Sequence, residues 1–289
     1  MKLAIIGANG QLGTDLQEVL SAEYDVAGLI HSDIEITDID NIKDVLSSIK
    51  PQIVLNTAAY NLVPEAEQYP QKAFHINGIG TLNLAKVCHD LKISLVHYST
   101  DYVFDGKKKQ PYIEDDCPNP LNVYASTKLS GEYFALNYTN KSYVIRVSGI
   151  YGKVPSRGKR GNFITTMIKL AKEKSEVRVV NDEILTPTPT YHIAKNTAKL
   201  IKTNAFGLYH MSCEGQCSWY EFAKVIWDTL QLETPVYPAS VKDFPLTVRR
   251  PFYSVLENKS LNKLGINEMP QWKEALKKFL VSETKNLPI

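Results

Sequence analysis

Two side chains four residues apart could carry out a proton transfer. Tyr124 and Lys128 have the spacing that places both on one face of a helix. An ammonium about 4 Å from a phenol favours its charged form by about 4 kcal/mol at an effective dielectric constant of about 20. That energy lowers a tyrosine pKa from about 10 to about 7. The pair therefore predicts a tyrosine that acts as a general acid near neutral pH.

A hydroxyl group is expected beside this pair. Ser99-Thr100-Asp101 follows an apolar strand, so the Thr100 side chain should lie at the carboxyl end of that strand, where open α/β sheets bind ligands. The Tyr124 and Lys128 spacing alone is more typical of a surface lysine beside a half-buried tyrosine. A hydroxyl, a tyrosine and a lysine beside a dinucleotide together favour proton transfer.

A glycine-rich segment near the start of the chain is the candidate cofactor loop. Gly7-Ala8-Asn9-Gly10-Gln11-Leu12-Gly13 separates the first predicted strand from the first predicted helix. Glycines at such a turn let backbone amides at a helix N-terminus approach a pyrophosphate. The spacing is GxxGxxG and not the GxGxxG of ordinary dinucleotide dehydrogenases, and a tight turn without a ligand is the alternative.

The elements that must position these residues alternate along the chain. The segments 2–6, 24–29, 53–56, 93–99 and 143–147 are typical of strands, and helical patterns separate them. Alternation of this kind predicts βαβ units, and hence an α/β fold with a doubly wound parallel sheet of the Rossmann type.

After Gly152 the pattern changes, which predicts a smaller α/β lobe that interleaves with the first domain in sequence. We expect helices over 163–174, 191–202, 219–230 and 272–280, and a strand over 207–212 that returns to the sheet. The predicted NAD(P)-binding domain is 1–152 with about 182–212. The predicted substrate-binding lobe is about 153–181 with 213–289.

Composition excludes several classes of protein. The chain has 289 residues, 44% of them hydrophobic, and a net charge of +2, which gives no electrostatic footprint for nucleic acid or an anionic membrane. No apolar run approaches the length of a membrane span. Four cysteines without a CxxC pair and six histidines without an HxxxH pair predict reduced thiols, a cytoplasmic location and no bound metal.

Several longer stretches resemble the dTDP-4-dehydrorhamnose reductase family of the extended short-chain dehydrogenases/reductases. They are Gly7 to Gly13, Asn56 to Tyr60, Ser99-Thr100-Asp101-Tyr102-Val103-Phe104-Asp105-Gly106, Tyr124 to Glu132 and Gly161-Asn162-Phe163. The resemblance covers nearly the whole chain. It implies NADPH- or NADH-dependent reduction of a nucleotide-linked 4-keto-6-deoxy sugar, most simply dTDP-4-dehydro-L-rhamnose to dTDP-L-rhamnose.

The same resemblance assigns roles to individual residues. Tyr124 would be the proton donor, Lys128 would lower its pKa and hold the nicotinamide ribose, and Thr100 would hydrogen-bond the substrate oxygen. Asp101 and Asn162 would contact the substrate. The expected cofactor-binding residues are Gly7, Gly10, Gln11, Leu12, Glu35, Ile36, Ala58, Ala59, Tyr60, Tyr98, Tyr124 and Lys128.

Four positions depart from the family pattern, and all of them bear on the substrate. Gly149 stands where many members carry a tryptophan, and Leu185 where a glycine is common. Asn61 replaces a threonine and Pro64 an aspartate. One alternative function remains open, because the regulatory subunit of methionine adenosyltransferase resembles this fold, also lacks the tryptophan and acts mainly by binding a partner enzyme.

Cations are expected to hold the diphosphate of a sugar nucleotide. Arg160, in a loop with Arg157 and Lys159, and Arg250, after Arg249, lie in the predicted substrate half, and an arginine fork binds phosphate bidentately. Solvated loop charges are the alternative. Residues 30–35 offer neither a cation for a 2′-phosphate nor an acid directly after Leu29, so we expect weak discrimination between NADPH and NADH. A homodimer is the candidate assembly.

Overall fold

Six strands form one parallel sheet in the computed structural model, which describes residues 1–155, 161–245 and 248–283. The strands are β1 (Lys2–Ile6), β2 (Asp25–Leu29), β3 (Ile53–Asn56), β4 (Ser94–Thr100), β5 (Ser142–Val147) and β10 (Gly207–His210). Their order is β10-β5-β4-β3-β1-β2, and all neighbours run parallel. The chain changes its direction across the sheet between β1 and β3, and such a switch point is where ligands bind. The predicted doubly wound parallel sheet is confirmed.

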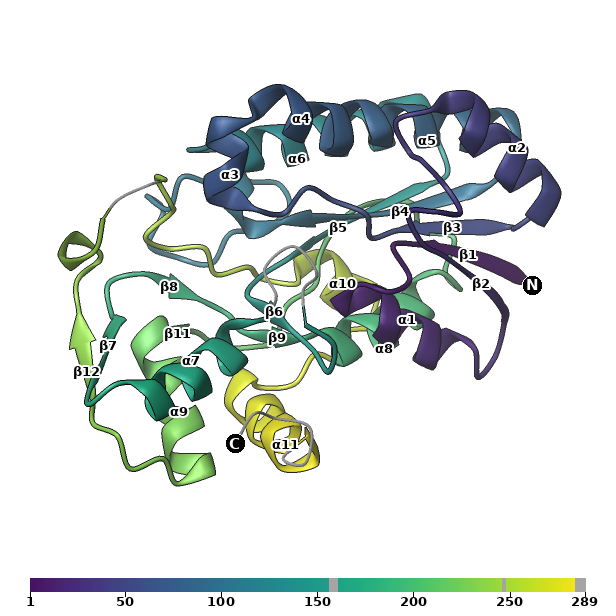
Figure 1. The fold of residues 1–289 in the computed structure, drawn as a ribbon. Helices are drawn as coiled ribbons and strands as arrows, with labels where there is room; N and C mark the ends of the chain where they lie inside the picture. Colours follow the sequence, from purple (N-terminus) through teal and green to yellow (C-terminus); the bar gives the residue numbers. More distant parts are fainter. Residues whose placement is uncertain (156–160, 246–247, 284–289) are drawn as a thin grey trace.

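Helices cover both faces of the sheet, because successive strand residues point to opposite sides and both sets are apolar. In β1, Leu3 and Ile5 pack in one cluster with α1 (Gln11–Leu20) and α8 (Thr190–Leu200). Ala4 and Ile6 pack in the other cluster with α2 (Ile39–Ile49), α5 (Gly80–Asp90) and α6 (Val123–Tyr138). Figure 1 shows these two helical layers above and below the sheet.

Short elements connect the strands at the edge where the site lies. They are α3 (Val63–Gln68), α4 (Pro70–Phe74), the π-helix η1 (His75–Ile79), and the single 3-10 turn η2 (Asp101–Val103) directly after β4.

The remaining elements lie on the α1 side of the sheet. The helices among them are α7 (Phe163–Glu173), α9 (Trp219–Leu230), α10 (Lys259–Lys263) and α11 (Trp272–Glu283), with a 3-10 turn η3 (Val241–Asp243). Three two-stranded sheets pair β6 (Ile150–Tyr151) with β9 (Thr188–Pro189), β7 (Val177–Val180) with β12 (Val236–Ala239), and β8 (Ile184–Leu185) with β11 (Cys217–Ser218). Figure 1 shows α7, α9, β7 and β12 at its lower left and α11 at its bottom.

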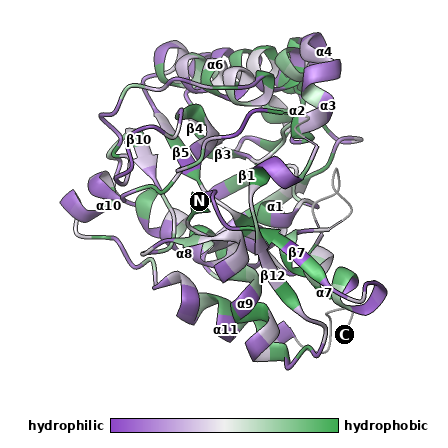
Figure 2. Ribbon diagram, turned by 90° about the vertical axis from the view of Figure 1, so that its left-hand side faces the viewer, coloured by the Kyte–Doolittle hydropathy of each residue, from purple (hydrophilic) through white to green (hydrophobic). Residues whose placement is uncertain are grey.

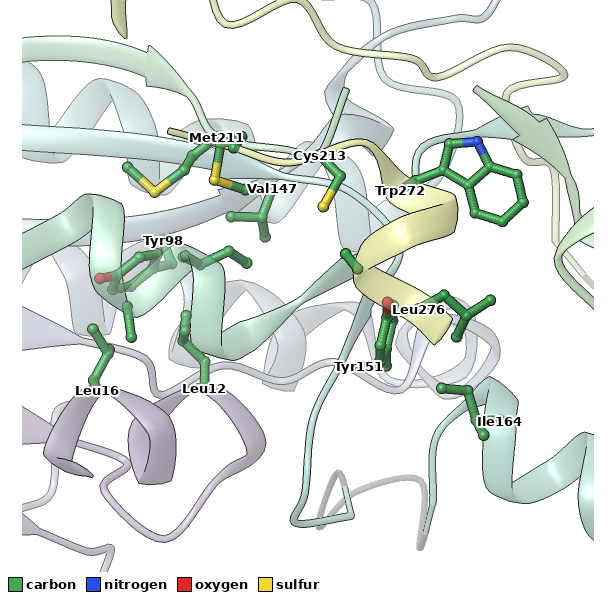
Figure 3. Packing of buried hydrophobic residues seen from close by; sticks show 14 of the residues in the cluster. Leu12, Leu16, Tyr98, Val147, Tyr151, Ile164, Met211, Cys213, Trp272 and Leu276 are labelled. Atoms are coloured by element: carbon green, nitrogen blue, oxygen red, sulfur yellow. The ribbon is translucent and has the colours of Figure 1, made fainter. Parts of the chain in front are cut away.

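One continuous core joins these elements to the sheet. Figure 3 shows Tyr151, Ile164 and Trp272 packed in the same cluster as Leu12 and Tyr98. Shared apolar burial of this kind fixes the C-terminal segments relative to the sheet edge.

The hydropathy of the chain follows this architecture. The covering helices in Figure 2 carry both hydrophobic and hydrophilic residues, as expected of helices with one buried face. Within the described ranges, no helix is both long and apolar enough to cross a membrane.

Candidate active site

The parallel sheet brings the sequence-predicted motifs to one edge. β1 ends at the glycine loop, β3 ends at Asn56 before Ala58-Ala59-Tyr60, and β4 ends at Thr100. Because parallel strands all end at the same edge, segments far apart in sequence meet there. The Thr57 hydroxyl donates hydrogen bonds to the carbonyls of Ile6 and Gly7 and joins the first two segments.

The glycine loop is shaped by close backbone packing. Gly7 has φ of +79°, and a Cβ there would lie 2.7 Å from Thr57 Oγ1. A Cβ at Gly13 would lie 2.2 Å from the Gly7 carbonyl oxygen, whereas one at Gly10 would meet only that oxygen, at 3.2 Å. Gly10 caps α1 without a side chain, so the first amides of α1 point into the crevice. This cradle fits a pyrophosphate.

The predicted adenine-side residues are held by local contacts. The Glu35 carboxylate accepts hydrogen bonds from the Thr37 amide and hydroxyl, which outweigh the effect of burial and lower its pKa. Ile36 is buried in the cluster under α5. The Tyr60 backbone is bonded at both its N–H and its carbonyl by the Asn77 side chain, from the π-helix η1.

Tyr124, the predicted proton donor, lies in the first turn of α6. Asn122 caps this helix by accepting a hydrogen bond from the Ala125 amide at 2.8 Å, and its side-chain amide donates to the Arg249 carbonyl at 2.9 Å. The Tyr124 ring is half-buried against the edge of Tyr102, with ring centroids 6.4 Å apart. The cap therefore links the start of α6 to the segment that carries Arg250.

The pKa of Tyr124 differs from the sequence-based expectation. Burial raises it to about 12, the Asp101 carboxylate also raises it, and a hydrogen bond with Thr100 opposes both. The expectation that Lys128 lowers this pKa toward 7 is wrong for this structure. The reason is that burial outweighs the other contributions to the Tyr124 pKa, and the Lys128 Nζ is held by the Tyr98 carbonyl. Burial also lowers the pKa of Lys128, to about 8. Tyr124 thus keeps its proton at neutral pH.

Lys128 is buried beneath Tyr124, one helical turn further along α6. Its Nζ donates to the Tyr98 carbonyl at 2.6 Å and lies 3.4 Å from His97 Nε2. The predicted role of Tyr98 is corrected here, because its side chain points away from the crevice into the core, where its hydroxyl bonds Thr197. Tyr98 acts on the site through its carbonyl group.

A buried ion pair anchors the face of α6 that carries Lys128. Glu132, one turn after Lys128, is paired with Arg146 of β5, whose Nε and Nη2 both reach the carboxylate, the latter at 2.6 Å. The Ser99 hydroxyl also donates to Glu132, at 2.5 Å. The Glu132 charge favours the ammonium form of Lys128.

Asp101 is occupied by protein groups and not exposed for a ligand. Its carboxylate accepts hydrogen bonds from Thr100 at 3.1 Å, Ser148 at 2.9 Å and Ser254 at 2.5 Å. Burial raises its pKa to about 6 in spite of these bonds. In this structure Asp101 therefore positions Thr100 and anchors the C-terminal segment, which differs from the predicted contact with the substrate.

The predicted substrate residues are only partly brought together. Arg250 is exposed, and its charge acts on Tyr102 and Glu183, so it lies at the Tyr124 end of the crevice. Asn162 instead caps α7, accepting from the Thr165 amide, and its side-chain amide donates to the Gly152 carbonyl and contacts Gln11. Arg160 falls outside the described residues.

A small cavity is lined in part by Pro251, the residue after Arg250. Its lining includes Tyr102, Glu183, Leu185, Trp219 and Ser254. The Trp219 indole donates to the buried Glu183 carboxylate at 3.2 Å.

Leu185 fills the space beside Gly149. A Cβ on Gly149, which has φ of +53°, would lie 2.8 Å from Leu185 Cδ1. In this chain the Leu185 side chain therefore takes room that a larger residue at position 149 would need.

Sequence reasoning missed three groups of site residues: the His97–Asn56 pair, the Glu132–Arg146 pair, and Ser148 with Ser254. The four-residue spacing of Tyr124, Lys128 and Glu132 is a signal that could have identified one of them. Among the described residues, no three His, Cys, Asp or Glu side chains are grouped to hold a metal ion.

The fold and this site define a class: a doubly wound dinucleotide-binding protein with a threonine, tyrosine and lysine at its crevice. The family model described as the RmlD substrate binding domain matches residues 1–285. The spore coat polysaccharide biosynthesis protein SpsK of Bacillus subtilis is 39% identical over 280 residues, with 96% of each chain covered. The dTDP-4-dehydrorhamnose reductase of Escherichia coli is 32% identical, with 97% of each chain covered.

A solved structure agrees with these relatives. The dTDP-4-dehydrorhamnose reductase of Bacillus anthracis, in complex with NADP, superposes with a TM-score of 0.93 at 39% identity and covers 97% of this chain and 99% of its own. The chain belongs to the RmlD family of the extended short-chain dehydrogenases/reductases.

Proposed function

We propose that this protein is an NAD(P)H-dependent reductase of a nucleotide-linked 4-keto-6-deoxy sugar, most simply of dTDP-4-dehydro-L-rhamnose to dTDP-L-rhamnose. The observation that carries the proposal is the meeting of Thr100, Tyr124 and Lys128 at the sheet edge beside the glycine loop. The names of its relatives supply the substrate class.

The residues present fit a dinucleotide. The amides at the start of α1 would hold the pyrophosphate, with Gly7 and Gly10 giving access, and Lys128 would hold the nicotinamide ribose. The side chains of Leu12 and Ile36 are buried, so Leu12 would contribute its amide and Ile36 its backbone. When bound, the reduced nicotinamide supplies a hydride to the C4 carbonyl.

Tyr124 donates the proton in this scheme. Its hydroxyl is hydrogen-bonded with Thr100, and its high pKa keeps the proton in place until an alkoxide develops on the substrate oxygen. In the free protein the single Thr100 O–H donates to Asp101, which orients the Thr100 side chain. With substrate bound, this O–H would turn to donate to the same substrate oxygen. The acid is therefore positioned before the reaction begins.

The substrate diphosphate is assigned to Arg250, with Arg160 as a second cation. Within this proposal, residues 1–152 and about 182–212 hold the cofactor, and about 153–181 and 213–289 hold the sugar nucleotide. The cytoplasmic location and the homodimer remain predictions.

An assay of the purified full chain tests the function. NADPH oxidation is followed with a panel of dTDP-, UDP- and GDP-linked 4-keto-6-deoxy sugars, and the corresponding sugars without the keto group serve as controls. We expect oxidation with a dTDP-linked keto sugar and none with the controls. No oxidation with any keto sugar, together with measurable NADPH binding by calorimetry, would favour a binding role like that of the methionine adenosyltransferase regulatory subunit.

A further inference from the structure

Two fully buried histidines each face a basic side chain at the same distance. His97 Nε2 lies 3.4 Å from Lys128 Nζ, and His210 Nε2 lies 3.4 Å from Arg146 Nη1. Both imidazoles are completely inaccessible to solvent. Burial is the main cause that lowers the pKa of His210 to about 3 and that of His97 well below 6.5. Both rings are therefore neutral, and each carries one N–H.

The tautomer of His210 is set by its second nitrogen. Nδ1 lies 3.0 Å from the Tyr112 carbonyl oxygen and 3.2 Å from that of Glu257. Carbonyl oxygens only accept hydrogen bonds, so Nδ1 carries the proton and Nε2 has the lone pair. That lone pair accepts a hydrogen bond from Arg146, which is always charged. The acceptor nitrogen of His210 therefore faces a group that can only donate hydrogen bonds.

His97 has the opposite tautomer, because Asn56 faces its Nδ1. The Ala58 amide donates to Asn56 Oδ1 at 3.1 Å, which fixes the orientation of the Asn56 side chain. Asn56 Nδ2 then donates to His97 Nδ1 at 3.2 Å. Nδ1 is thus an acceptor, and the proton of His97 lies on Nε2, directed at Lys128.

An ammonium cannot accept this hydrogen bond, whereas an amine can. We propose that His97 is a positioning residue that donates its Nε2–H to the unprotonated amine of Lys128, with Asn56 fixing the tautomer that makes this possible. The inference rests on the proposed function only in giving Lys128 a role in the reaction. Its contacts are those of the free protein.

The other groups around Lys128 favour different protonation states of its side chain. The Tyr98 carbonyl accepts a hydrogen bond from either form of the lysine. The Glu132 carboxylate, held by Arg146 and Ser99, favours the ammonium, and His97 favours the amine. A lysine with its pKa lowered to about 8 can exchange a proton near neutral pH.

His97 and Glu132 act on Lys128 in opposite directions, so the protonation state of this lysine, one helical turn from the proposed proton donor Tyr124, depends on both.

Nitrogen NMR of the full-length protein labelled with ¹⁵N-histidine tests the tautomer without substrate or activity. We expect His97 to carry its proton on Nε2 and His210 to carry its proton on Nδ1, with single-histidine variants giving the assignments. A His97 ring protonated on Nδ1 in the wild-type protein would overturn the proposal, whether or not the protein reduces sugars.

Two substitutions test the consequence for Lys128, with its titration followed by NMR of ¹³C-labelled lysine. In His97→Gln, the side-chain oxygen can accept from Asn56 and the amide can donate to Lys128, so we expect the pH midpoint of Lys128 to be kept. In Asn56→Asp, a second carboxylate oxygen replaces Nδ2 and requires a proton on His97 Nδ1. We expect the tautomer to invert and the midpoint to rise by about one pH unit or more.

A matched control is Asn137→Asp, an exposed site on the same helix whose amide bonds the Tyr133 carbonyl. It adds the same charge and should leave both the His97 tautomer and the Lys128 midpoint unchanged. An unchanged tautomer in Asn56→Asp, or a midpoint that moves equally in both aspartate variants, would contradict the proposal. Should Asn56→Asp not fold, the wild-type tautomer still decides.

Discussion

The two sides of the crevice are built in different ways. On the proton-transfer side, Thr100 and Lys128 are almost fully buried, and their polar atoms are held by other buried groups. On the side proposed to hold the substrate, Arg250 is exposed, and Leu185 occupies the space beside Gly149. Buried hydrogen-bond networks tolerate few replacements, because each change leaves a partner unsatisfied. The reaction type is thus fixed more firmly than the substrate.

The largest expected effect is on the buried side. Tyr124→Phe removes the hydroxyl that hydrogen-bonds Thr100 and keeps the ring that packs against Tyr102. We expect kcat to fall by about 10²- to 10⁴-fold, as for the loss of a general acid, with little change in the affinity for NADPH. Steady-state kinetics and calorimetry measure the two quantities.

Lys128→Met is the companion variant. Because Lys128 is assigned the nicotinamide ribose and supports the helical turn that carries Tyr124, both kcat and NADPH affinity should fall. A Tyr124→Phe enzyme that keeps most of the wild-type rate would show that Tyr124 is not the proton donor.

Asp101, which hydrogen-bonds both Thr100 and Ser254, makes the stability of the protein depend on pH. The folded protein holds the Asp101 proton more tightly than the unfolded chain, because burial raises its pKa to about 6. Its contribution to stability is therefore fully present below about pH 4 and is lost as the pH rises through about 6. We expect the stability of wild type relative to Asp101→Asn to fall by about 2 kcal/mol between about pH 4.5 and about pH 7, measured by urea unfolding.

Asp105→Asn is the control of opposite sign. A backbone hydrogen bond from Lys107 is the main cause that lowers the pKa of Asp105, so its contribution is lost as the pH falls. If the stability of both variants relative to wild type changes with pH in the same direction, burial does not raise the pKa of Asp101.

The substrate side should respond in binding and not in rate. Arg250→Ala is expected to raise KM for the sugar nucleotide about tenfold, equivalent to about 1.4 kcal/mol, with little change in kcat or in KM for NADPH. The effect should shrink as salt is added, because exposed charges are screened. Arg249→Ala is the matched control, since the contact of this residue with α6 is through its carbonyl. Equal effects of both variants would refute a specific role for Arg250.

The fold was largely readable from the sequence, because its strands are short apolar runs whose two faces are both buried. The strand predicted over 53–56 and the helix over 219–230 have those bounds in the structure. The strand predicted over 2–6 also has those bounds. The remaining predicted elements differ by a few residues at their ends, where capping by Asn122 or Asn162 depends on neighbours.

The site was only partly readable, because side-chain direction and protonation depend on contacts between distant segments. Tyr98 was expected at the cofactor, but its position in β4 turns the ring into the core. The carboxylate of Asp101 is occupied by Ser254, 153 residues away, which no local pattern indicates. The Tyr124 pKa was misjudged for the same reason, since the partners of Lys128 lie on β4.

The smallest expected effect concerns the coenzyme. Glu35 lies 3.4 Å from His31, and His31 and His75 both act on its charge, but no lysine or arginine occurs in residues 30–35. We expect kcat/KM for NADPH and NADH to differ by less than about a hundredfold, or about 2.7 kcal/mol. A larger preference would mean that the second-strand loop has been misread.

Deuterium transfer shows directly whether hydride from NADPH reaches C4 of the keto sugar. The protein is incubated with a dTDP-4-keto-6-deoxy sugar and NADPH deuterated at C4 of the nicotinamide, each stereospecifically labelled form in turn. NMR then locates the label. We expect that one of the two forms delivers deuterium to C4 of the sugar, and that Tyr124→Phe delivers it to the same carbon far more slowly. If the sugar nucleotide remains unlabelled with both forms, although it and NADPH bind, the protein is not a reductase of this sugar.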